Sequence, residues 1–299
     1  MAVDSTEIES AAVLISLALE EDLQQRGDLT SQATIPESAA ATVSVVARQP
    51  GSLSGAILIQ PVYSALTDRP PHMNRCEVHT LMEDGDRLEP GAVIATVTGP
   101  VQSLLAGERI ALNFLSHLSG IASHTAEFVA RTHGTRVIVL DTRKTLPGYR
   151  ALQKYAVRCG GGTNHRTGLC DGLLIKDNHL AARTDHTVTR CVLSAREYLS
   201  ESSLQLPVEV EVDTLDQLRD VLTVQPDIVL LDNMCTTDLQ RAVTIRNKVS
   251  PETLLEASGG IGLDNIGCVA GTGVDRISVG ALTHSAPALD IGCDWKHLN

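Results

Sequence analysis

The chain has 299 residues and a formal net charge of −12, and 43% of its residues are hydrophobic. This composition is typical of a globular protein with one large domain or two of ordinary size. Aromatic residues make up only 2%, and the acidic balance leaves no general basic face, which together argue against a nucleic-acid-binding protein. No apolar run is long enough to cross a bilayer, and the acidic N-terminus lacks the basic start of a secretory signal.

The cysteine pattern indicates a reducing compartment. The chain has seven cysteines, and none of them forms a CxxC pair. Their spacing is typical neither of a zinc site nor of a disulfide framework. We therefore expect reduced, mostly buried thiols in a cytoplasmic protein.

The first half of the chain predicts a small α/β domain. Residues 7–23 place apolar side chains on one helical face, namely Ile8, Ala11, Ala12, Ile15, Leu19 and Leu23. Short β-type runs with Gly and Pro between them follow at 41–47, 55–59, 76–81 and 92–99. Residues 107–131 then predict one long helix or a broken pair, which we expect to join two domains. Its buried stripe would be Ile110, Phe114, Leu115, Leu118, Ile121 and Phe128.

The second half alternates apolar strands with helices. The expected strands are VIVL (137–140), LLI (173–175), VEVEV (208–212), DIVLL (227–231), TLLEA (253–257) and RISVG (276–280). Helix-like stretches such as 214–223 and 238–249 separate most of them. This alternation predicts a parallel sheet that is covered on both faces, and it favours a closed α/β barrel over an open sheet.

Chemically active side chains follow almost every one of these strands. The first strand leads into Asp141, Thr142, Arg143 and Lys144, the second into Lys176, and the fourth into Asp232 and Asn233. The last two lead into Ser258, Gly259 and Gly260, and into Gly280 and Ala281. In α/β barrels the active site lies at the carboxyl ends of the strands, so the pattern predicts an enzyme.

The charges in this half indicate a site for small anions. Residues 141–190 hold nine Lys and Arg against four Asp and Glu, although the whole chain is acidic. Each cation alone would be read as a solvated surface residue, but together at strand ends they favour a polyanion site. Glu211 and Asp232 stand inside or at the end of apolar strands, and Glu209 shares one strand face with Glu211. Carboxylates such as Glu211 and Asp232 predict Mg²⁺ bridging phosphates, or else an ion pair with Lys144 or Lys176.

Two turns rich in glycine have the pattern of a phosphate site. Residues 258–262 read SGGIG, and Gly280-Ala281 follows the next strand. Backbone amides in such strand-to-helix turns bind phosphate, and the last loops of a barrel are the usual place. The Gly-rich run CGGGTNHR at 159–166 predicts a loop that approaches a ligand closely.

The block DTRKTLPGYRALQKYAVRCGGGTNHRTGLCDGLLIKDNHL (141–180) closely resembles the central signature of quinolinate phosphoribosyltransferases. The resemblance extends through VEVEVDTLDQL, DIVLLDNM, LEASGGI and ISVGALTHSAPALDI, and back to GERIALNFLSHLSGIA. It implies an N-terminal α/β sandwich at 1–115, joined by the C-terminal segment 285–299. It also implies an incomplete, seven-stranded α/β barrel at 116–284. The implied reaction is quinolinate plus phosphoribosyl pyrophosphate giving nicotinate mononucleotide, pyrophosphate and CO₂.

The resemblance also implies roles for individual residues. Quinolinate would be bound by Arg109, Arg143, Lys144, His165, Arg166 and Lys176, with Arg109 donated across a homodimer or a larger assembly of dimers. Phosphoribosyl pyrophosphate would be bound by Lys144, Lys176, Glu211, Asp232, Ser258, Gly259, Gly260, Gly280 and, less closely, His284. Glu211 and Asp232 would hold Mg²⁺ directly or through water, and the catalytic set would be Lys144, Lys176, Glu211 and Asp232.

Three alternative functions stay open at this point. The first is nicotinate phosphoribosyl transfer without decarboxylation, which the density of cations between 143 and 176 disfavours. The second is an aldolase that forms a Schiff base at Lys144 or Lys176 on a phosphate-binding barrel. The third is a paralogue without catalytic activity, against which the intact charged set argues.

Overall fold

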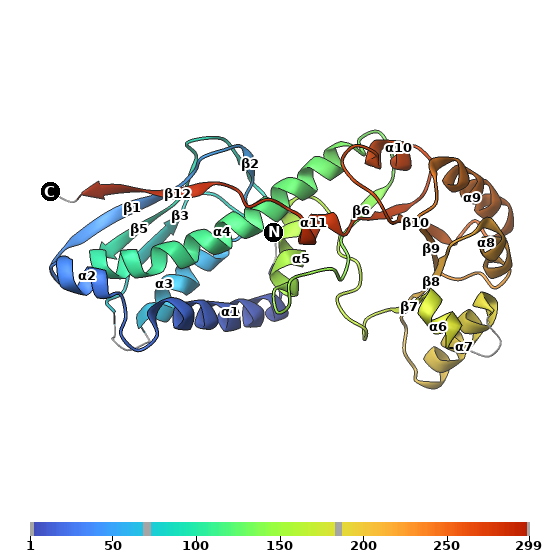
Figure 1. The fold of residues 1–299 in the computed structure, drawn as a ribbon, viewed down its shortest axis with the longest axis horizontal. Coiled ribbons are helices and arrows are strands. Elements are labelled where there is room, and N and C mark those ends of the chain that lie inside the picture. The colour runs from blue at the N-terminus through green and yellow to red at the C-terminus, as the bar shows by residue number, and fades with distance from the viewer. Residues whose placement is uncertain (1–2, 68–72, 183–186, 298–299) are drawn as a thin grey trace. The chain divides into compact units, whose positions relative to one another are not determined.

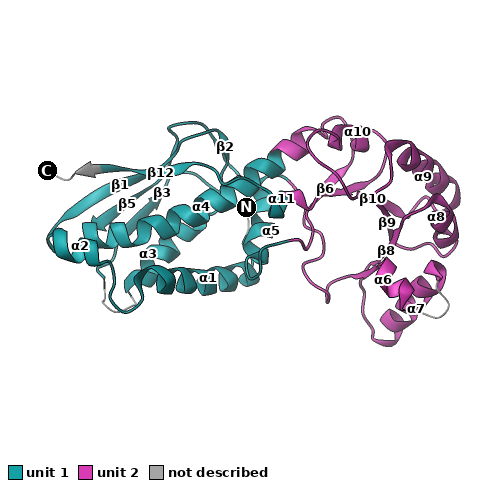
Figure 2. Cartoon of the chain, in the orientation of Figure 1, with its two compact units in different colours: residues 1–126, 145–161, 282–299 teal, residues 127–144, 162–281 magenta. Residues whose placement is uncertain are grey.

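The computed structural model describes residues 3–67, 73–182 and 187–297. They form two compact units (Figure 2). The first unit comprises residues 1–126, 145–161 and 282–299, and the second comprises 127–144 and 162–281. A domain boundary after residue 115 stays a prediction. No helix in the described part of the chain is both long enough and apolar enough to span a membrane.

The first unit is built on a four-stranded antiparallel sheet. Its order is β12 (Ile291–His297), β1 (Ala40–Ala47), β5 (Val93–Pro100) and β3 (Glu77–Thr80). The strand β1 is rich in β-branched residues and is buried along most of its length, which explains its central place in the sheet. The C-terminal strand β12 pairs with β1 from Ala41 opposite His297 to Ala47 opposite Ile291. Residues 291–297 therefore belong to the same sheet as residues 40–47 (Figure 1).

The chain segments of the first unit also form helices and a short β-ribbon. They are α1 (Ser5–Leu23), α2 (Leu29–Thr34), α3 (Ile59–Thr67), α4 (Val101–Ala130) and α5 (Arg150–Cys159), with a short ribbon of β2 (Gly51–Ser52) and β4 (Arg87–Leu88). The expected long helix at 107–131 is confirmed as the single helix α4, and all six residues of its expected apolar stripe are buried. The division between the two units falls within α4, after Ala126.

Two expectations for the first unit are wrong in detail. Ile8 is 60% exposed, and the buried face of α1 is formed instead by Glu7, Ala11, Leu14, Ile15 and Leu19. The run at 55–59 is not a strand: Gly55 adopts the left-handed conformation (φ 100°), and Ala56–Leu58 form a 3₁₀ turn that leads into α3. An apolar run of five residues suits either a buried strand or a buried helix, and periodicity alone does not separate them.

The second unit is built on a six-stranded parallel sheet. Its order is β6 (Ile138–Leu140), β11 (Arg276–Ser278), β10 (Leu254–Ser258), β9 (Ile228–Asp232), β8 (Val208–Val212) and β7 (Leu173–Ile175). These are the six strands expected from the apolar runs, and the parallel arrangement is confirmed. Between them lie α6 (Asp177–Ala181), α7 (Val188–Glu201), α8 (Leu215–Leu222), α9 (Thr236–Val249) and α10 (Ile266–Ala270), and α11 (Ala281–His284) follows the last strand.

The expected α/β barrel is found in an open form. Six strands, not seven, are formed within the described ranges, and the next position beside β6 is a single parallel bridge between Leu140 and Thr163. Along β8 the valines are buried on one face while Glu209 and Glu211 point to the other, because side chains alternate along a strand. The helices cover the valine face, so the glutamates point toward the inside of the curved sheet.

Candidate active site

The carboxyl ends of the six parallel strands meet at one edge of the sheet, which we call the rim. Arg143 and Lys144 follow β6, Lys176 follows β7, and Asp232 and Ser258 end β9 and β10. Asp232 and Ser258 are paired in register across the two strands. The structure therefore brings the strand-end residues that sequence singled out to a common edge of one sheet.

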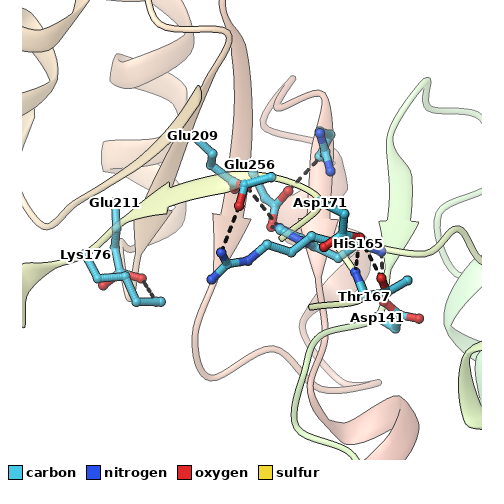
Figure 3. Close-up of polar contacts among 11 residues, drawn as sticks. Asp141, His165, Thr167, Asp171, Lys176, Glu209, Glu211 and Glu256 are labelled. Carbon is cyan, nitrogen blue, oxygen red and sulfur yellow. Dashed lines mark hydrogen bonds and ion pairs between the residues drawn. The ribbon is translucent and has the colours of Figure 1, made fainter. Parts of the chain in front are cut away.

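Lys176 and Glu211 form an ion pair at the rim. The Lys176 Nζ donates to Glu211 Oε2, and both residues come from neighbouring strands (Figure 3). The lysine side chain is 40% exposed and the glutamate side chain 10%. A half-exposed lysine next to a nearly buried carboxylate leaves the cation accessible to a ligand while it neutralises the acid.

Arg143 and Arg166 are half-buried cations whose charges act on each other. The Nε atoms of both guanidinium groups are buried, and neither has a hydrogen-bond partner among the described residues. The Nη1 atom of Arg166 donates to the carbonyl of Gly172 at 3.1 Å. Burial and the nearby positive charge of Arg143 together lower the pKa of Arg166. Buried donors without an acceptor are rare in proteins and cost free energy, so this pair has the chemistry of an anion site.

His165 precedes Arg166 in the same loop and lies on the inward-facing side of the sheet, below the rim. Its Nε2 atom lies 3.1 Å from Glu209 Oε2 and 3.4 Å from Glu256 Oε1 (Figure 3). Burial alone would lower the pKa of His165, but hydrogen bonds and negative charge from the two glutamates outweigh it and raise the pKa to about 9. Arg276 completes the group, because its Nε lies 3.0 Å from Glu256 Oε2. The ring thus belongs to a buried network of opposite charges.

The sequence did not point to Glu256 and Arg276 as members of a site. Both lie in the expected strand runs at 253–257 and 276–280. The one signal in the sequence is that each is a charged residue on the inward-facing side of its strand. Glu256 pairs in register with Arg276 on β11 and with Leu230 on β9. A charged residue in an otherwise apolar strand is therefore the signal that could have found them.

Two groups of side chains have the composition of a cation site. His165, Glu209 and Glu256 place their ligand atoms within 4.8 Å of one another, but Arg276 already supplies the positive charge next to Glu256, so we treat them as an ion-pair network. Glu211 and Asp232 lie at the rim instead, on neighbouring strands, and offer the hard oxygen ligands that Mg²⁺ prefers. Glu211 is itself paired with Lys176, but the second pair offers carboxylate oxygens alone, whereas the first group includes an imidazole nitrogen. By donor type, the second pair therefore fits the expected ion better.

The turn after β10 has the backbone that the sequence predicted. Gly259 and Gly260 adopt positive φ angles of 91° and 62°. A Cβ atom on Gly259 would lie 2.3 Å from the side-chain oxygen of Asn233, so only glycine fits there. The Asn233 amide N–H donates to the Ser258 carbonyl at 2.9 Å, and the Asn233 side chain donates to Asp232. The glycine turn and the end of β9 are thus locked together at the rim.

Two residues of the expected set lie in the first unit. Arg109 is an exposed residue of α4, and His284 is an exposed residue at the end of α11 whose Nδ1 lies 2.6 Å from the Ser285 hydroxyl. Their part in a site with the rim stays a prediction.

A cavity of about 660 Å³ lies at the opposite ends of the strands. Its lining includes Ile138, Leu254 and Asp275, which stand at or just before the starts of β6, β10 and β11. None of the cations at the rim lines it. In α/β barrels the catalytic residues lie at the carboxyl ends of the strands. We therefore do not assign the active site to this cavity, despite its size.

Known proteins resemble the chain along most of its length. Residues 28–119 match the family model of the quinolinate phosphoribosyl transferase N-terminal domain, and residues 121–294 match that of the C-terminal domain. The chain is 45% identical to the nicotinate-nucleotide pyrophosphorylase [carboxylating] of Mycobacterium leprae, over 96% of this chain and 98% of that protein. The solved nicotinate-nucleotide pyrophosphorylase of Francisella tularensis is 36% identical, with a TM-score of 0.87 and 96% of both chains covered. The solved NadC of Streptococcus pyogenes is 35% identical, with a TM-score of 0.89 and full coverage of both chains. The chain belongs to the quinolinate phosphoribosyl transferase family.

Proposed function

We propose that this protein transfers the phosphoribosyl group of phosphoribosyl pyrophosphate to quinolinate and removes one carboxylate as CO₂, giving nicotinate mononucleotide and pyrophosphate. The observation that carries the proposal is the pair of buried guanidinium Nε donors of Arg143 and Arg166. Two neighbouring cations whose Nε donors have no acceptor are stabilised by a ligand with two carboxylates, because it satisfies these donors and offsets the repulsion between the charges. The family of the chain and the names of its relatives agree with this reading.

Arg143 and Arg166 hold the dicarboxylate, and Lys144 and Lys176 line the same rim. Binding by two forked guanidinium groups fixes the ring in one orientation, so that its nitrogen faces the anomeric carbon of the sugar. Once the nitrogen carries the ribose, the ring is a pyridinium that stabilises a carbanion at the neighbouring carbon. The 2-carboxylate then leaves as CO₂, and the carbon takes a proton. No residue needs to act as a covalent nucleophile in this scheme.

Glu211 and Asp232 are proposed to bind the ribose and pyrophosphate side of the second substrate together with Mg²⁺. They fit a magnesium ion by their oxygen donors and by their place on neighbouring strands. When bound, Mg²⁺ offsets the negative charge that develops on the departing pyrophosphate. Lys176 adds a positive charge at the same place, and its pairing with Glu211 keeps the ammonium group near the rim.

Ser258, Gly259, Gly260 and Gly280 are proposed to hold the 5′-phosphate. The positive φ angles of Gly259 and Gly260 turn the backbone of this exposed loop, where amide N–H groups can face an anion. His284, which follows in α11, is proposed as a further contact for the sugar phosphate.

A homodimer in which Arg109 reaches the partner's quinolinate site is part of the proposal. Its support is the exposure of this arginine on α4. The test mixes two inactive variants, Arg109→Ala and Arg143→Ala, after reversible dissociation. If each site takes residues from two chains, about a quarter of the sites become native by random pairing, and activity returns. If each chain contains its own complete site, the mixture stays inactive.

The direct test incubates the protein with quinolinate, phosphoribosyl pyrophosphate and Mg²⁺, and follows nicotinate mononucleotide and CO₂ together. We expect equal amounts of both products, and none when either substrate is left out. Nucleotide formed from nicotinate, without CO₂ from quinolinate, would show the non-decarboxylating transferase instead. Trapping of a carbonyl substrate on Lys144 or Lys176 by borohydride would show the aldolase, and no turnover of any kind would show a protein without catalysis.

A cytoplasmic location is also proposed. The structure, over the residues it describes, places none of the seven cysteines in a disulfide, which is the usual state in a reducing compartment. Fractionation of the source cells followed by detection of the protein tests this point.

A further inference from the structure

A buried amide in the first unit joins three separate segments of the chain. Gln153 lies on α5 and is fully buried. Its Oε1 atom accepts the backbone N–H of Leu146 at 2.9 Å, and its Nε2 atom donates to the carbonyl of Thr283 on α11 at 3.3 Å. The same Nε2 atom lies 3.0 Å from Nε2 of His117 on α4. One side chain, which the proposed reaction does not use, therefore fastens a loop and two helices to α5.

These hydrogen bonds determine the protonation of His117. A backbone N–H can only donate, so the Gln153 atom that faces Leu146 is the oxygen, and the atom that faces the ring is the amide nitrogen. The amide nitrogen also only donates, so Nε2 of His117 accepts, and the ring is neutral with its proton on Nδ1. Burial lowers the pKa of His117 and so favours the same neutral form.

An aromatic contact holds the loop at a second point. The loop comprises residues 145–149, between Lys144 and α5. The Tyr149 ring lies edge-on to His117, with ring centroids 5.6 Å apart, and it stacks on Phe114 of α4 at 6.1 Å. The Tyr149 N–H also donates to the Leu146 carbonyl at 3.1 Å. The loop is thus fixed by α4 and α5 together.

The two ends of this arrangement stand next to proposed ligand contacts. Leu146 lies two residues after Lys144, and Thr283 directly precedes His284. Lys144 and His284 are both proposed to bind phosphoribosyl pyrophosphate. The helix α11 has only four residues, and a helix this short is not stable by itself. The place of His284 therefore depends on tertiary contacts such as the bond from Gln153 to Thr283.

We propose that Gln153 and His117 are positioning residues for phosphoribosyl pyrophosphate, because they tie the loop that follows Lys144 to the helix that carries His284. This inference rests on the proposed function, since it takes Lys144 and His284 as contacts of that substrate. Neither Gln153 nor His117 touches the substrate in this account. Both act through the chain segments that they hold.

The first test removes the hydrogen bonds but keeps the size of the side chain. Gln153→Met should raise the KM for phosphoribosyl pyrophosphate roughly tenfold. Gln102→Met is the matched control, because Gln102 also joins two segments of the first unit, donating to the Ile35 carbonyl at 2.8 Å. The control should keep the wild-type KM. An unchanged KM in Gln153→Met, or an equal rise in both variants, would overturn the inference.

A double-mutant cycle tests whether Gln153 acts through α11. The variants are Gln153→Met, His284→Ala and both together, with the KM for phosphoribosyl pyrophosphate measured in each. The rise in the double variant should be clearly smaller than the product of the two single rises, because the two residues share one route to the substrate. A rise equal to that product would show that they act independently, which contradicts the proposal.

The third test reverses the polarity of the bond to His117. The carboxylate of Gln153→Glu cannot donate to a neutral ring, but it pairs with a protonated one. The elements around the ring also carry other titratable or charged groups, namely Tyr149 on the loop, Arg150 and Lys154 on α5, His284 on α11, and Glu21 of α1, whose charge acts on Tyr149. None of them outweighs burial, because the pKa of His117 is lowered. The introduced carboxylate should therefore be the group that brings a proton to the ring.

The measured quantity is the KM for phosphoribosyl pyrophosphate in Gln153→Glu divided by that of the wild type. This ratio should stay below about twofold at pH 6 and rise to roughly fivefold at pH 9, where the ring is neutral and the bond is lost. Titration of the substrate and of His284 is common to both proteins and cancels in the ratio. A ratio that does not change with pH would overturn the inference. Because Gln153→Glu keeps the shape of the side chain and the acceptor for Leu146, it decides the question even if Gln153→Met does not fold.

The design separates this inference from the proposed function. If the wild-type protein forms no nicotinate mononucleotide, the proposed function fails before any variant is compared. If the wild type turns over but the KM for phosphoribosyl pyrophosphate is insensitive to both changes at Gln153, only the inference fails.

Discussion

Strand β8 carries two glutamates, Glu209 and Glu211, which are only two residues apart but lie in different surroundings. Glu211 stands at the rim, where the side chain of its partner Lys176 is 40% exposed. Glu209 stands one layer deeper, where its partner His165 has a side chain only 9% exposed. The outer pair is open to ligands and ions, whereas the inner group is closed on itself. The difference shows how position along one strand divides roles. A carboxylate at the rim is accessible to substrate, whereas a carboxylate two residues deeper holds other side chains in place.

The largest expected effect comes from removing a cation at the rim. Arg143→Ala should lower kcat/KM for quinolinate by more than about a hundredfold, because it removes a forked, buried contact to a carboxylate. The KM for phosphoribosyl pyrophosphate should change little. Steady-state kinetics with each substrate varied in turn measures this. Arg241→Ala, an exposed arginine of α9 paired with Asp238, is the control and should have wild-type kinetics. Equal losses for both substrates would contradict the division between the two ligand sites.

The next effect compares the two glutamates directly. Glu211→Gln should lower kcat/KM for phosphoribosyl pyrophosphate by roughly thirtyfold and weaken its dependence on Mg²⁺, because a hard anionic oxygen ligand is lost. Glu209→Gln should leave both quantities near the wild-type values. Activity measured as a function of Mg²⁺ concentration in both variants tests this difference. Identical Mg²⁺ curves for the two variants would remove the distinction between outer and inner carboxylates.

A smaller effect is expected at the glycine turn of the rim. Gly259→Ala should raise the KM for phosphoribosyl pyrophosphate roughly tenfold, because the new Cβ collides with Asn233 and displaces the loop. The matched control is Gly273→Ala, which has the same φ of 91° but meets its nearest atom, on Val243, only at 3.5 Å. Both variants carry the strain of a positive φ, so only the collision differs. A similar change in KM for both would show that strain alone, and not the rim, is responsible.

The smallest expected effect is a pH dependence of the free energy of unfolding, caused by His165 and its partners Glu209 and Glu256. The pKa of His165 is raised to about 9, above its ordinary value near 6.5, so the folded protein holds this proton more tightly than the unfolded chain. The stabilisation is complete below about pH 6.5 and is lost as the pH rises through 9, with a slope of at most about 1.4 kcal/mol per pH unit. Urea unfolding between pH 6 and pH 10 measures it. The slope should flatten in Glu209→Gln and persist in Glu211→Gln, and the opposite pattern would assign the proton elsewhere.

Most of the scaffold of the second unit was predictable, because its strands are continuous apolar runs and the residues after them are polar. The run DIVLL at 227–231 is one of several short, β-branched apolar runs that alternate with helix-like stretches, and this repetition predicts covered parallel strands. Asp232 marks where the burial of this strand ends. The first unit was harder. The run at 55–59 was expected to be a strand but is helical, because the left-handed Gly55 and the packing of Ile59, Val62 and Tyr63 decided between two conformations that the local pattern allowed equally.

The sequence alone therefore determined the strand-end cations, the glycine turn and the family of the chain, since each of these is a local pattern of residue types. Only the tertiary structure decided which charges meet. Glu256 and Arg276 face one another because β10 and β11 pair in one register, and His165 reaches Glu209 because a loop 44 residues earlier in the chain folds beneath the rim. Register and loop placement depend on packing over the whole unit, and a shift of one residue along a strand would turn Glu209, Glu256 or Arg276 to the opposite face of the sheet.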